Sequence, residues 1–442
     1  MERFAEKQLI SWKNNPHRKP LIVMGARQVG KTYLLLQFGK RHYDHVAYIN
    51  CDNNPQVANL FAEDYDMDRI MLAISAITHV PIIAGKTLII LDEIQELKHG
   101  LTALKYFCEL VPEQHIAVAG SLLGITMHQG ESAPVGKVDI INMYPLTYTE
   151  FLRAIGQEQM VQILQSKDWT SIQMLKHDYI KFLRLYYFVG GMPEAIVKYI
   201  ENNDAMAVRQ TQNNILSIYR SDMSKHASQQ EVVRITQVWQ SIPSQLAREN
   251  KKFIYGAIKS GARAREFELA IQWLVDAGLV IRINRATKPQ LPLKFYEDLS
   301  AFKLYLLDIG IMAALANVPP AELLTHDNSL SGSKGAFTEN YVMTQLATMR
   351  DVTMSYFSND NHTLEIDLLL QEGNNIWPIE IKAEENLRSK SLATYIKDYP
   401  ELIGLRFSMS DYRDQEWMRN VPLYACESYF SKSPSSFAIN ID

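Results

Sequence analysis

The sequence has few cysteines, no long apolar run and little net charge. Its three cysteines, Cys51, Cys108 and Cys426, are too few and too scattered for a disulfide framework or a four-ligand zinc site, and they fit a reducing compartment. No stretch approaches the roughly 20 apolar residues that cross a bilayer, and the N-terminus lacks the apolar core of a signal peptide. We therefore expect a cytoplasmic protein with no membrane partner.

The formal net charge of −4 excludes a polybasic binder of nucleic acid or of anionic membranes, although one domain can still carry a basic face. With 47% hydrophobic and 21% charged residues, the chain has enough apolar material for packed cores and is not mainly disordered. Its 442 residues suggest about three domains at roughly 150 residues each.

Residues 1–150 alternate short apolar runs with segments of helical length. Five runs bounded by Gly, Asp or Ser are typical of parallel strands buried on both faces. They are 21–25, 46–50, 87–93, 115–121 and 139–144. The sequence therefore predicts an α/β fold whose first domain, 1–150, contains a doubly wound parallel sheet.

The rest of the chain divides into three further regions. Residues 151–228 place apolar residues three and four apart, which predicts a helical lid. In 229–324 helices precede a short hairpin, which suggests a winged helix-turn-helix and a connector. Its part 229–300 holds 11 Lys or Arg against 7 Asp or Glu, as expected of either a nucleic-acid face or an ordinary solvated surface. Residues 325–442 begin with a loop and are expected to form an α/β or α+β unit of their own.

The segment after the first predicted strand fits the phosphate-binding loop, Gly, four residues, Gly-Lys-Thr. It consists of Gly25, Ala26, Arg27, Gln28, Val29, Gly30, Lys31 and Thr32. The glycines let backbone N–H groups converge on phosphates, and the following helix adds the partial positive charge of its N-terminus. Lys31 is expected to reach the β and γ phosphates and Thr32 to ligate magnesium. The loop predicts ATP or ADP and Mg²⁺ as cofactors.

Two carboxylates follow the apolar strand 88–91. Asp92 is expected to hold the magnesium ion, directly or through water, and Glu93 to orient and deprotonate the attacking water; a plain acidic strand cap is the alternative. The next predicted strand ends at Gly120-Ser121. Ser121 is a candidate contact of the γ phosphate or the water, although Gly-Ser is also common turn chemistry.

These motifs resemble those of predicted ATPases of the AAA class that carry a C-terminal domain of unknown function, number 4143 (DUF4143). The resemblance covers nearly the whole chain and rests on GARQVGKT (25–32), LIILDEIQELKHGLTALKYF (88–107), AGS (119–121), YPLTYTEFL (144–152) and GGMPEAI (190–196). It implies an AAA-class ATP-binding core in 1–150, a helical lid, a winged helix and a tail related to restriction-endonuclease-like folds.

The segment Gly190-Gly191-Met192-Pro193 is similar to the Gly-x-Pro element of signal-transduction ATPases, which implies that Pro193 lies near the adenine. From the residues alone it is a helix end followed by proline at the first position of a new helix. Hydrolysis between protomers of a homo-oligomer would also need an arginine finger. The helical region offers three candidates, which are more often surface ion-pair residues and among which the sequence does not choose: Arg153, Arg184 and Arg220.

The C-terminal region orders a Glu on a helix, an Asp on a strand, and Glu-x-Lys on the next strand: Glu339, Asp367, Glu380 and Lys382. This order resembles the PD-(D/E)XK nuclease core, although Ile366 replaces the usual proline. The resemblance implies a second magnesium site at Asp367 and Glu380, assisted by Glu339, with Lys382 positioning the water. The alternative is a half-exposed strand with a lysine that neutralises its acids.

Ser389, Lys390 and Ser391 begin the following helix, where they suit either a phosphate or simple capping. From these motifs we expect an ATPase whose nucleotide state controls a DNA-associated activity. The alternative is a nucleotide-dependent switch that binds a protein partner and uses the tail as a non-catalytic platform.

Overall fold

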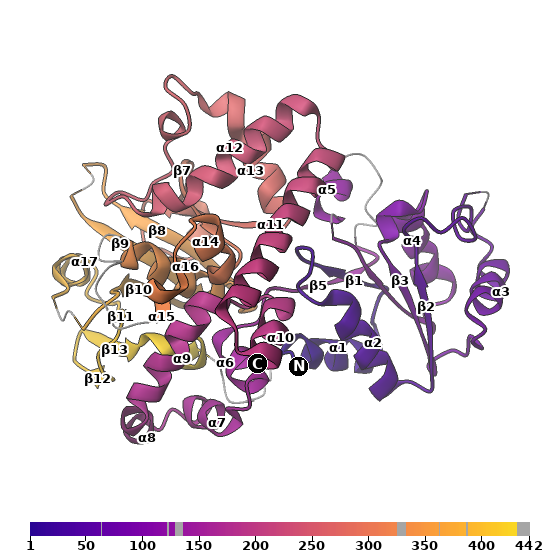
Figure 1. Ribbon diagram of the computed structural model, residues 1–442, viewed down its shortest axis with the longest axis horizontal. Coiled ribbons are helices and arrows are strands. Elements are labelled where there is room, and N and C mark those ends of the chain that lie inside the picture. Colours follow the sequence, from indigo (N-terminus) through magenta and orange to yellow (C-terminus); the bar gives the residue numbers. More distant parts are fainter. Residues whose placement is uncertain are drawn as a thin grey trace, which may run out of the picture.

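The computed structural model describes residues 1–62, 64–121, 123–128, 136–324, 333–361, 363–385 and 388–430; most of the loop predicted at 325–335 lies outside them. The described chain forms a five-stranded parallel sheet and an eight-stranded mixed sheet. The two sheets lie at opposite ends of the molecule, and the long helix α11 (Ala205–His226) runs between them (Figure 1). No helix among the described residues is long and apolar enough to cross a membrane.

The first sheet has the strand order β2-β3-β4-β1-β5. All five predicted runs form strands: β1 (Leu21–Met24), β2 (His45–Asn50), β3 (Thr87–Asp92), β4 (His115–Ala119) and β5 (Asp139–Asn142). Because every pair is parallel, the carboxyl ends of β1, β3 and β4 meet at one edge of the sheet. This edge carries the phosphate loop, Asp92 and Ser121.

Helices cover both faces of this sheet, so its strands are apolar on both sides. Alternate residues of one strand join different cores: Leu21 and Val23 belong to the same hydrophobic cluster as Phe38, whereas Ile22 belongs to the cluster of Leu104. The connecting elements are α1 (Ala5–Asn14), α2 (Lys31–His42), α3 (Met67–Thr78), the 3-10 turn η1 (Ile94–Glu96), α4 (Gly100–Leu110) and α5 (Leu123–His128). The predicted α/β class with a doubly wound sheet is confirmed.

A run of helices follows the first sheet, as its periodicity predicts. They are α6 (Tyr148–Ala154), α7 (Glu158–Ser166), α8 (Trp169–Met174), α9 (Lys176–Val189), α10 (Pro193–Asn202) and α11. Gly190, with φ 75°, ends α9 in a conformation that favours glycine, and Pro193 occupies the first turn of α10. The Gly-Gly-x-Pro element therefore folds as a helix break between α9 and α10.

The eight-stranded sheet has the order β12-β13-β11-β10-β9-β8-β6-β7. Its strands are β6 (Val280–Ala286), β7 (Glu297–Leu306), β8 (Val352–Ser358), β9 (Glu365–Glu372), β10 (Asn375–Ile381), β11 (Gly404–Ser408), β12 (Arg413–Asp414) and β13 (Met418–Pro422). The helices are α12 (Gln229–Leu246), α13 (Ala264–Asp276), α14 (Ile309–Leu315), α15 (Pro320–Leu324), α16 (Lys334–Leu346), α17 (Lys390–Asp398) and α18 (Cys426–Phe430), with 3-10 turns η2 (Tyr255–Ala257), η3 (Leu293–Tyr296) and η5 (Leu423–Ala425).

The hairpin predicted within 229–324 is present as β6 and β7, which pair antiparallel. Strand β6 also pairs with β8 in parallel. The hairpin is therefore part of the same sheet as the strands of 325–442, and the two predicted regions share one sheet. The division into domains and the winged-helix assignment stay predictions.

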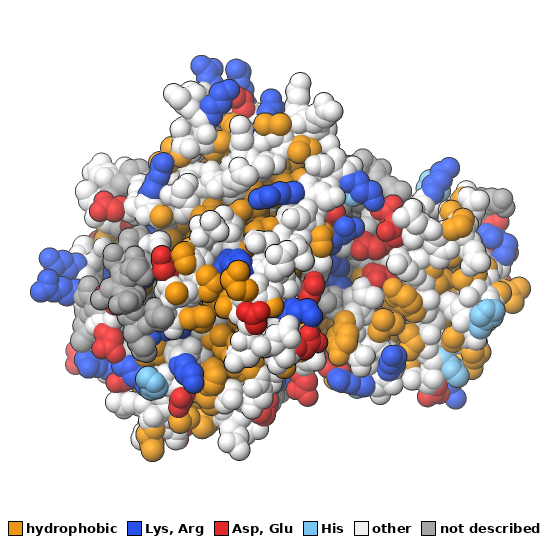
Figure 2. Space-filling view, in the orientation of Figure 1, with side chains coloured by type: hydrophobic (Ala, Val, Ile, Leu, Met, Phe, Trp, Pro, Cys, Tyr) orange, Lys and Arg blue, Asp and Glu red, His pale blue; other side chains and the backbone are white. Residues whose placement is uncertain are grey.

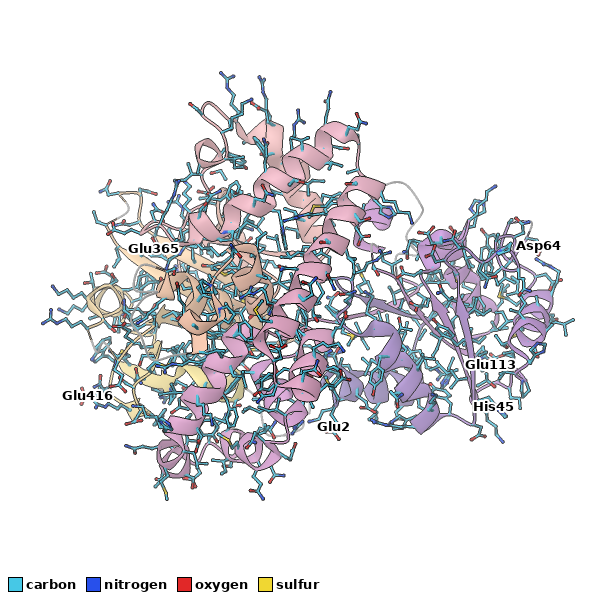
Figure 3. All side chains as sticks on the ribbon, in the orientation of Figure 1. Glu2, His45, Asp64, Glu113, Glu365 and Glu416 are labelled. Atoms are coloured by element: carbon cyan, nitrogen blue, oxygen red, sulfur yellow. The ribbon has the colours of Figure 1, made fainter. Side chains whose placement is uncertain are left out.

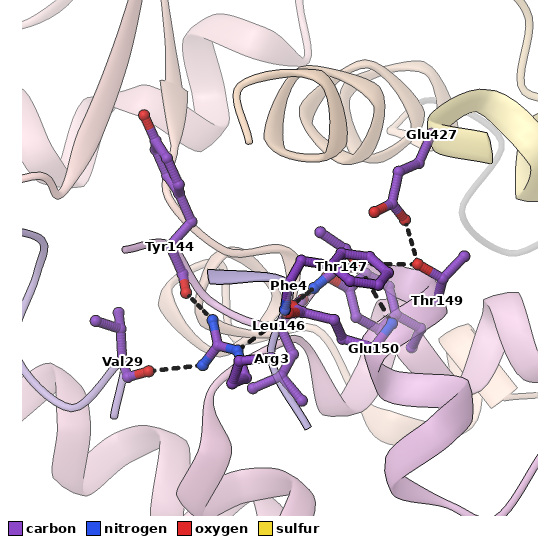
Figure 4. Close-up of polar contacts among 10 residues, drawn as sticks. Arg3, Phe4, Val29, Tyr144, Leu146, Thr147, Thr149, Glu150 and Glu427 are labelled. Carbon is purple, nitrogen blue, oxygen red and sulfur yellow. Dashed lines mark hydrogen bonds and ion pairs between the residues drawn. The ribbon is translucent and has the colours of Figure 1, made fainter. Parts of the chain in front are cut away.

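A buried ion pair joins the N-terminus to the beginning of the helical region (Figure 4). Arg3 Nε lies 3.2 Å from Glu150 Oε1, and the two side chains are 7% and 5% exposed. Arg3 also donates to the carbonyl oxygens of Val29, in the phosphate loop, and Tyr144, after β5. Glu150 additionally closes a capping box with Thr147 at the start of α6. One guanidinium thus holds three chain segments together.

The same network reaches the last described helix. Thr149 Oγ1 donates to Glu427 Oε2 at 2.7 Å, and the hydroxyls of Thr147 and Thr149 lie 3.2 Å apart. Burial, followed by the charge of Glu150, raises the pKa of Glu427 to about 7. The contact places a titratable carboxyl between α6 and α18.

We predict that Glu150→Gln lowers the free energy of unfolding by about 3–5 kcal/mol, because it leaves the buried Arg3 guanidinium without its counter-charge. The measurement is urea unfolding at neutral pH. The matched control is Glu158→Gln, whose carboxylate pairs with Arg153 at the surface and is expected to contribute at most about 1 kcal/mol. Equal losses in the two variants would contradict the structural role of the buried pair.

The raised pKa of Glu427 predicts how stability changes with pH. The folded protein binds this proton more tightly than the unfolded chain, so the contribution is present below pH 4.5, the ordinary pKa, and is lost as pH rises through about 7. We expect Glu427→Gln to gain up to about 3 kcal/mol over the wild type between pH 5 and pH 8. Urea unfolding at both pH values measures this, with the exposed Glu113→Gln as control; parallel profiles would refute it.

Candidate functional site

The phosphate loop connects β1 to α2 and has the backbone that its glycines predict. Gly25 and Gly30 have φ angles of 140° and 94°. A Cβ at Gly25 would lie 2.1 Å from the carbonyl oxygen of Met143, so no larger residue fits. Gln28 also has a positive φ, 64°, a conformation that is rare outside glycine and common at functional turns.

Lys31 turns back over the loop. Its Nζ donates to the carbonyl oxygens of Gly25 and Ala26 at 2.8 Å each. Burial lowers the pKa of Lys31 to about 8, against the opposing charges of Glu93 and Asp92. A phosphate inside the loop would give this desolvated ammonium a charged partner in place of two carbonyls.

Thr32, in the first turn of α2, contacts Asp92, at the end of β3, as expected for segments that share one edge of the sheet. Thr32 Oγ1 donates to Asp92 Oδ2 at 2.7 Å, and Tyr48 Oη donates to the same oxygen at 3.3 Å. A hydroxyl and a carboxylate are the ligand types that Mg²⁺ takes from proteins when phosphates and waters complete its octahedron. The residues present therefore fit a nucleotide-bound magnesium ion.

Glu93 lies at the end of β3 with φ 52° and faces the end of β4. Ser121 donates to it from its hydroxyl at 2.9 Å and from its backbone N–H at 3.2 Å, and Gln95 donates at 2.6 Å. Burial acts to raise the pKa of Glu93, but these hydrogen bonds outweigh it and hold the pKa below its usual value. Ser121 is therefore a partner of Glu93 in this structure, and Gln95 is a partner that the sequence did not single out.

Helix α11 supplies a carboxylate that the sequence did not indicate. Asp222 Oδ1 lies 2.7 Å from Arg27 Nη1, and Tyr219 Oη donates to the carbonyl oxygen of Arg27 at 3.1 Å. Burial, with a contribution from the charge of Glu93, raises the pKa of Asp222. The charge of Asp222 in turn opposes the lowering of the pKa of Lys31 by burial. A negative charge on the helix between the two sheets thus lies beside the phosphate loop.

The lid proline lies against the same loop. A Cβ added to Gly30 would be 3.6 Å from Pro193 Cγ, so α10 begins directly beside the loop, as a contact with the nucleotide requires. Among the arginine-finger candidates, Arg153 pairs with Glu158 at 3.0 Å, and Arg220 is exposed on α11. The roles of Pro193 and of a finger stay predictions.

The four C-terminal residues lie in one neighbourhood of the eight-stranded sheet, together with lysines that the sequence did not single out. Glu339 forms an ion pair with Lys251 and accepts from Tyr305 Oη at 3.2 Å. Lys303 Nζ, fully buried, lies 2.5 Å from Glu365. Figure 3 shows Glu365 on this sheet, far from Asp64 at the other end of the molecule.

The remaining predicted residues complete this cluster. Asp367 accepts from the backbone N–H of Ile381 at 2.8 Å, and burial, followed by the charge of Glu339, raises the pKa of Asp367 to about 7. Lys382 Nζ lies 2.9 Å from Glu380; burial opposes its charge, but Glu380, Asp367 and Glu339 together raise its pKa. Among the described residues no group of three or more His, Cys, Asp or Glu side chains could hold a metal ion, so a second magnesium site stays a prediction.

Comparison with known proteins gives three family matches. Residues 17–152 match the model of an AAA domain, residues 180–322 a domain of unknown function (DUF8612), and residues 334–426 a domain of unknown function (DUF4143). The first match contains the phosphate loop and Glu93, and the third contains the C-terminal carboxylates. No curated protein matches the chain.

Solved structures with partial similarity include three proteins of low identity. The Walker-type ATPase PABY2304 of Pyrococcus abyssi is 13% identical, with 71% of this chain and 95% of that chain covered and a TM-score of 0.45. The Aeropyrum pernix ORC1 protein in complex with DNA is 15% identical (73% and 94% covered, TM-score 0.30). The Thermotoga maritima RuvB Holliday junction branch migration motor is 13% identical (64% and 90% covered, TM-score 0.31). TM-scores below 0.5 carry no information about what this chain binds.

The parallel sheet, its loop and the family match define an AAA-class P-loop ATPase domain in 17–152. The match at 334–426 adds the DUF4143 domain, so the chain carries both the AAA domain and the C-terminal domain that the motifs predicted. The resemblance indicated by the motifs is confirmed.

We predict that Asp222→Asn tightens ATP binding roughly tenfold, about 1.4 kcal/mol, because a carboxylate beside Lys31 and Arg27 competes with phosphate for the same charges. Titration with a fluorescent ATP analogue measures the change. Asp204→Asn, at the exposed start of the same helix, is the control because asparagine keeps the cap. Unchanged or weaker binding in Asp222→Asn would show that the ion pair serves the loop and does not compete with the nucleotide.

Proposed function

We propose that the protein is a magnesium-dependent ATP hydrolase whose nucleotide state controls a DNA-associated activity. The observation that carries this proposal is Glu93, held by Ser121 and Gln95 at the edge of the sheet where Lys31, Thr32 and Asp92 also lie. A strand end that needed only solvation would not have a partly buried carboxylate fixed by three hydrogen bonds.

The residues divide the reaction between them. Lys31 and the loop N–H groups bind the β and γ phosphates, while Thr32 and Asp92 would hold magnesium, which would neutralise charge on the transferred phosphoryl group. Glu93, ionised at neutral pH because its pKa is low, accepts the proton of the attacking water. Ser121 positions the carboxylate of Glu93, and Pro193 lies against the adenine of the nucleotide. Hydrolysis is slow and regulated in this proposal.

Direct contacts support control of the C-terminal region by the nucleotide. A Cβ at Gly278, after α13, would lie 3.2 Å from the backbone nitrogen of Ala26. Asp222 of α11 pairs with Arg27, and Arg3 connects Val29 to the α6–α18 contacts. A loop that tightens around phosphates therefore pulls on α11, on α13 and on α6.

In this function, DNA contacts either the helices and hairpin of 229–324 or the tail, 325–442. The ATPase core is 1–150 and the lid is 151–228. Three free cysteines support a reducing, cytoplasmic location. A homo-oligomer that supplies an arginine finger is compatible with the exposed Arg220.

A second candidate is a nucleotide-dependent switch that binds a protein partner through the C-terminal sheet. It is favoured by the ion pairs of Lys251 with Glu339 and Lys303 with Glu365, because lysines already neutralise acids that a nuclease would give to metal ions. In this candidate the tail is a non-catalytic platform, and nuclease activity is absent.

The test is ATP turnover with and without DNA. We expect Glu93→Gln to bind ATP normally and to hydrolyse it roughly 100-fold or more slowly, the usual contribution of a positioned base. Lys31→Ala, which removes the ammonium that reaches the β and γ phosphates, is the control that loses binding. Wild-type turnover in Glu93→Gln would show that another residue acts as the general base. Turnover that does not change when DNA is added would favour the nucleotide-dependent switch that binds a protein partner.

A further inference from the structure

A basic cavity lies at the far end of the eight-stranded sheet from the ATPase core. It encloses about 290 Å³ between the start of α17 and the strands β11, β12 and β13. Lys and Arg side chains gather on the surface at the α17 end of the molecule (Figure 2). The lining residues include four cations and, among the described residues, no acid: Arg388, Ser389, Lys390, Ala393, Arg406, Arg413, Gln415, Trp417 and Met418.

Arg406 gives this cavity a fixed, buried cation. It is 2% exposed, and its Nε donates to Asn420 Oδ1 at 2.8 Å while its Nη1 donates to Ser389 Oγ at 3.1 Å. Burial lowers the pKa of Arg406; Glu380 on the neighbouring strand opposes this, and Arg413 adds to it. Two neutral side chains thus help to orient the guanidinium, and burial lowers its pKa despite the opposing charge of Glu380.

The first turn of α17 carries a positive side chain, whereas negative side chains stabilise the start of a helix. Acidic residues stabilise the first turn of a helix and cations destabilise it, yet this first turn has no acid and begins at Lys390. Ser389, the N-cap residue, makes no side-chain cap because its hydroxyl accepts from Arg406. Glu416 belongs to the turn between Gln415 and Trp417 but does not line the cavity.

We propose that this cavity binds a phosphate group. Arginines are preferred for phosphates because a planar guanidinium donates two parallel hydrogen bonds, and the N-terminus of α17 adds its partial positive charge. The cavity is near the lower end of the size range of ligand pockets, which suits a phosphate and little more. A bound anion would also relieve the repulsion between Arg406 and Arg413.

The structure favours a backbone phosphate of DNA as the source of this group, and this step rests on the proposed DNA-associated function. Arg406 pairs in register with Glu380, so the cavity adjoins the strand that carries Glu380 and Lys382. Lys390 and Arg413 are exposed at its rim, open to a long polyanion. Trp417, partly buried in the lining, offers an aromatic surface of the kind on which nucleic-acid bases stack.

The experiment compares wild type with the double variant Lys390→Gln/Arg413→Gln, whose side chains are exposed and whose loss leaves the fold intact. The control, Lys40→Gln/Lys397→Gln, removes the same charge at exposed positions outside the lining. Fluorescence anisotropy of labelled single- and double-stranded DNA is measured over a series of salt concentrations. We expect the double variant to bind about tenfold more weakly and to lower the slope of log K against log salt by about 1–2, that is, by up to about one for each cation removed.

A second arm titrates inorganic phosphate into the same three proteins by calorimetry. If the double variant loses DNA affinity and the control does not, a phosphate of the DNA backbone is the ligand. If the double variant loses binding of inorganic phosphate but keeps its DNA affinity, free phosphate is the ligand. If the double variant matches the control in both arms, the site is overturned even where the wild type binds DNA. If the wild type binds no DNA, the proposed DNA-associated function fails, and the phosphate arm alone decides the cavity.

Discussion

The buried ion pair between Arg3 and Glu150 is the constraint on which the ATPase site depends. Neither charge can remain buried alone, because a desolvated ion without its partner costs several kcal/mol. The pair therefore fixes the N-terminus against α6, and through the carbonyl of Val29 it fixes the phosphate loop against both. The loop that must fit phosphates is held by a contact that involves no phosphate.

This arrangement means that the loop is already ordered around its own groups. Lys31 donates to the loop carbonyls, and Arg27 pairs with Asp222. A nucleotide must replace these contacts with its phosphates, so part of its binding energy is used to release α11. Because α11 lies between the two sheets, breaking the ion pair between Arg27 and Asp222 would free this helix from the loop and so alter its contacts with the eight-stranded sheet region. Differential contact of this kind is what a ligand needs to shift a conformational equilibrium.

The sequence predicted most of the fold and the local part of the site. The five parallel strands follow from short apolar runs, and the meeting of Thr32 with Asp92 follows from strand ends that share one edge. Asp222, Lys251 and Lys303 were not predictable, because each acts through a contact between distant segments. Gln95 lies only two residues from Glu93, but nothing in that spacing marks its side chain as a partner. The hairpin was recognised as a hairpin, but its pairing with β8 depends on a strand some seventy residues later, which no local pattern reveals.

The C-terminal cluster shows why a matching motif does not by itself define an active site. Glu339 and Glu365 have lysine partners, of which Lys303 is fully buried, and burial raises the pKa of Asp367 to about 7, so the cluster balances its charge through lysines and protonation. A metal ion would have to displace Lys251, which lies after α12 in the region that adjoins the phosphate loop through Gly278. The charge state of the cluster therefore depends on a contact made by the segment after α12, and a metal ion that took Glu339 as a ligand would break this contact.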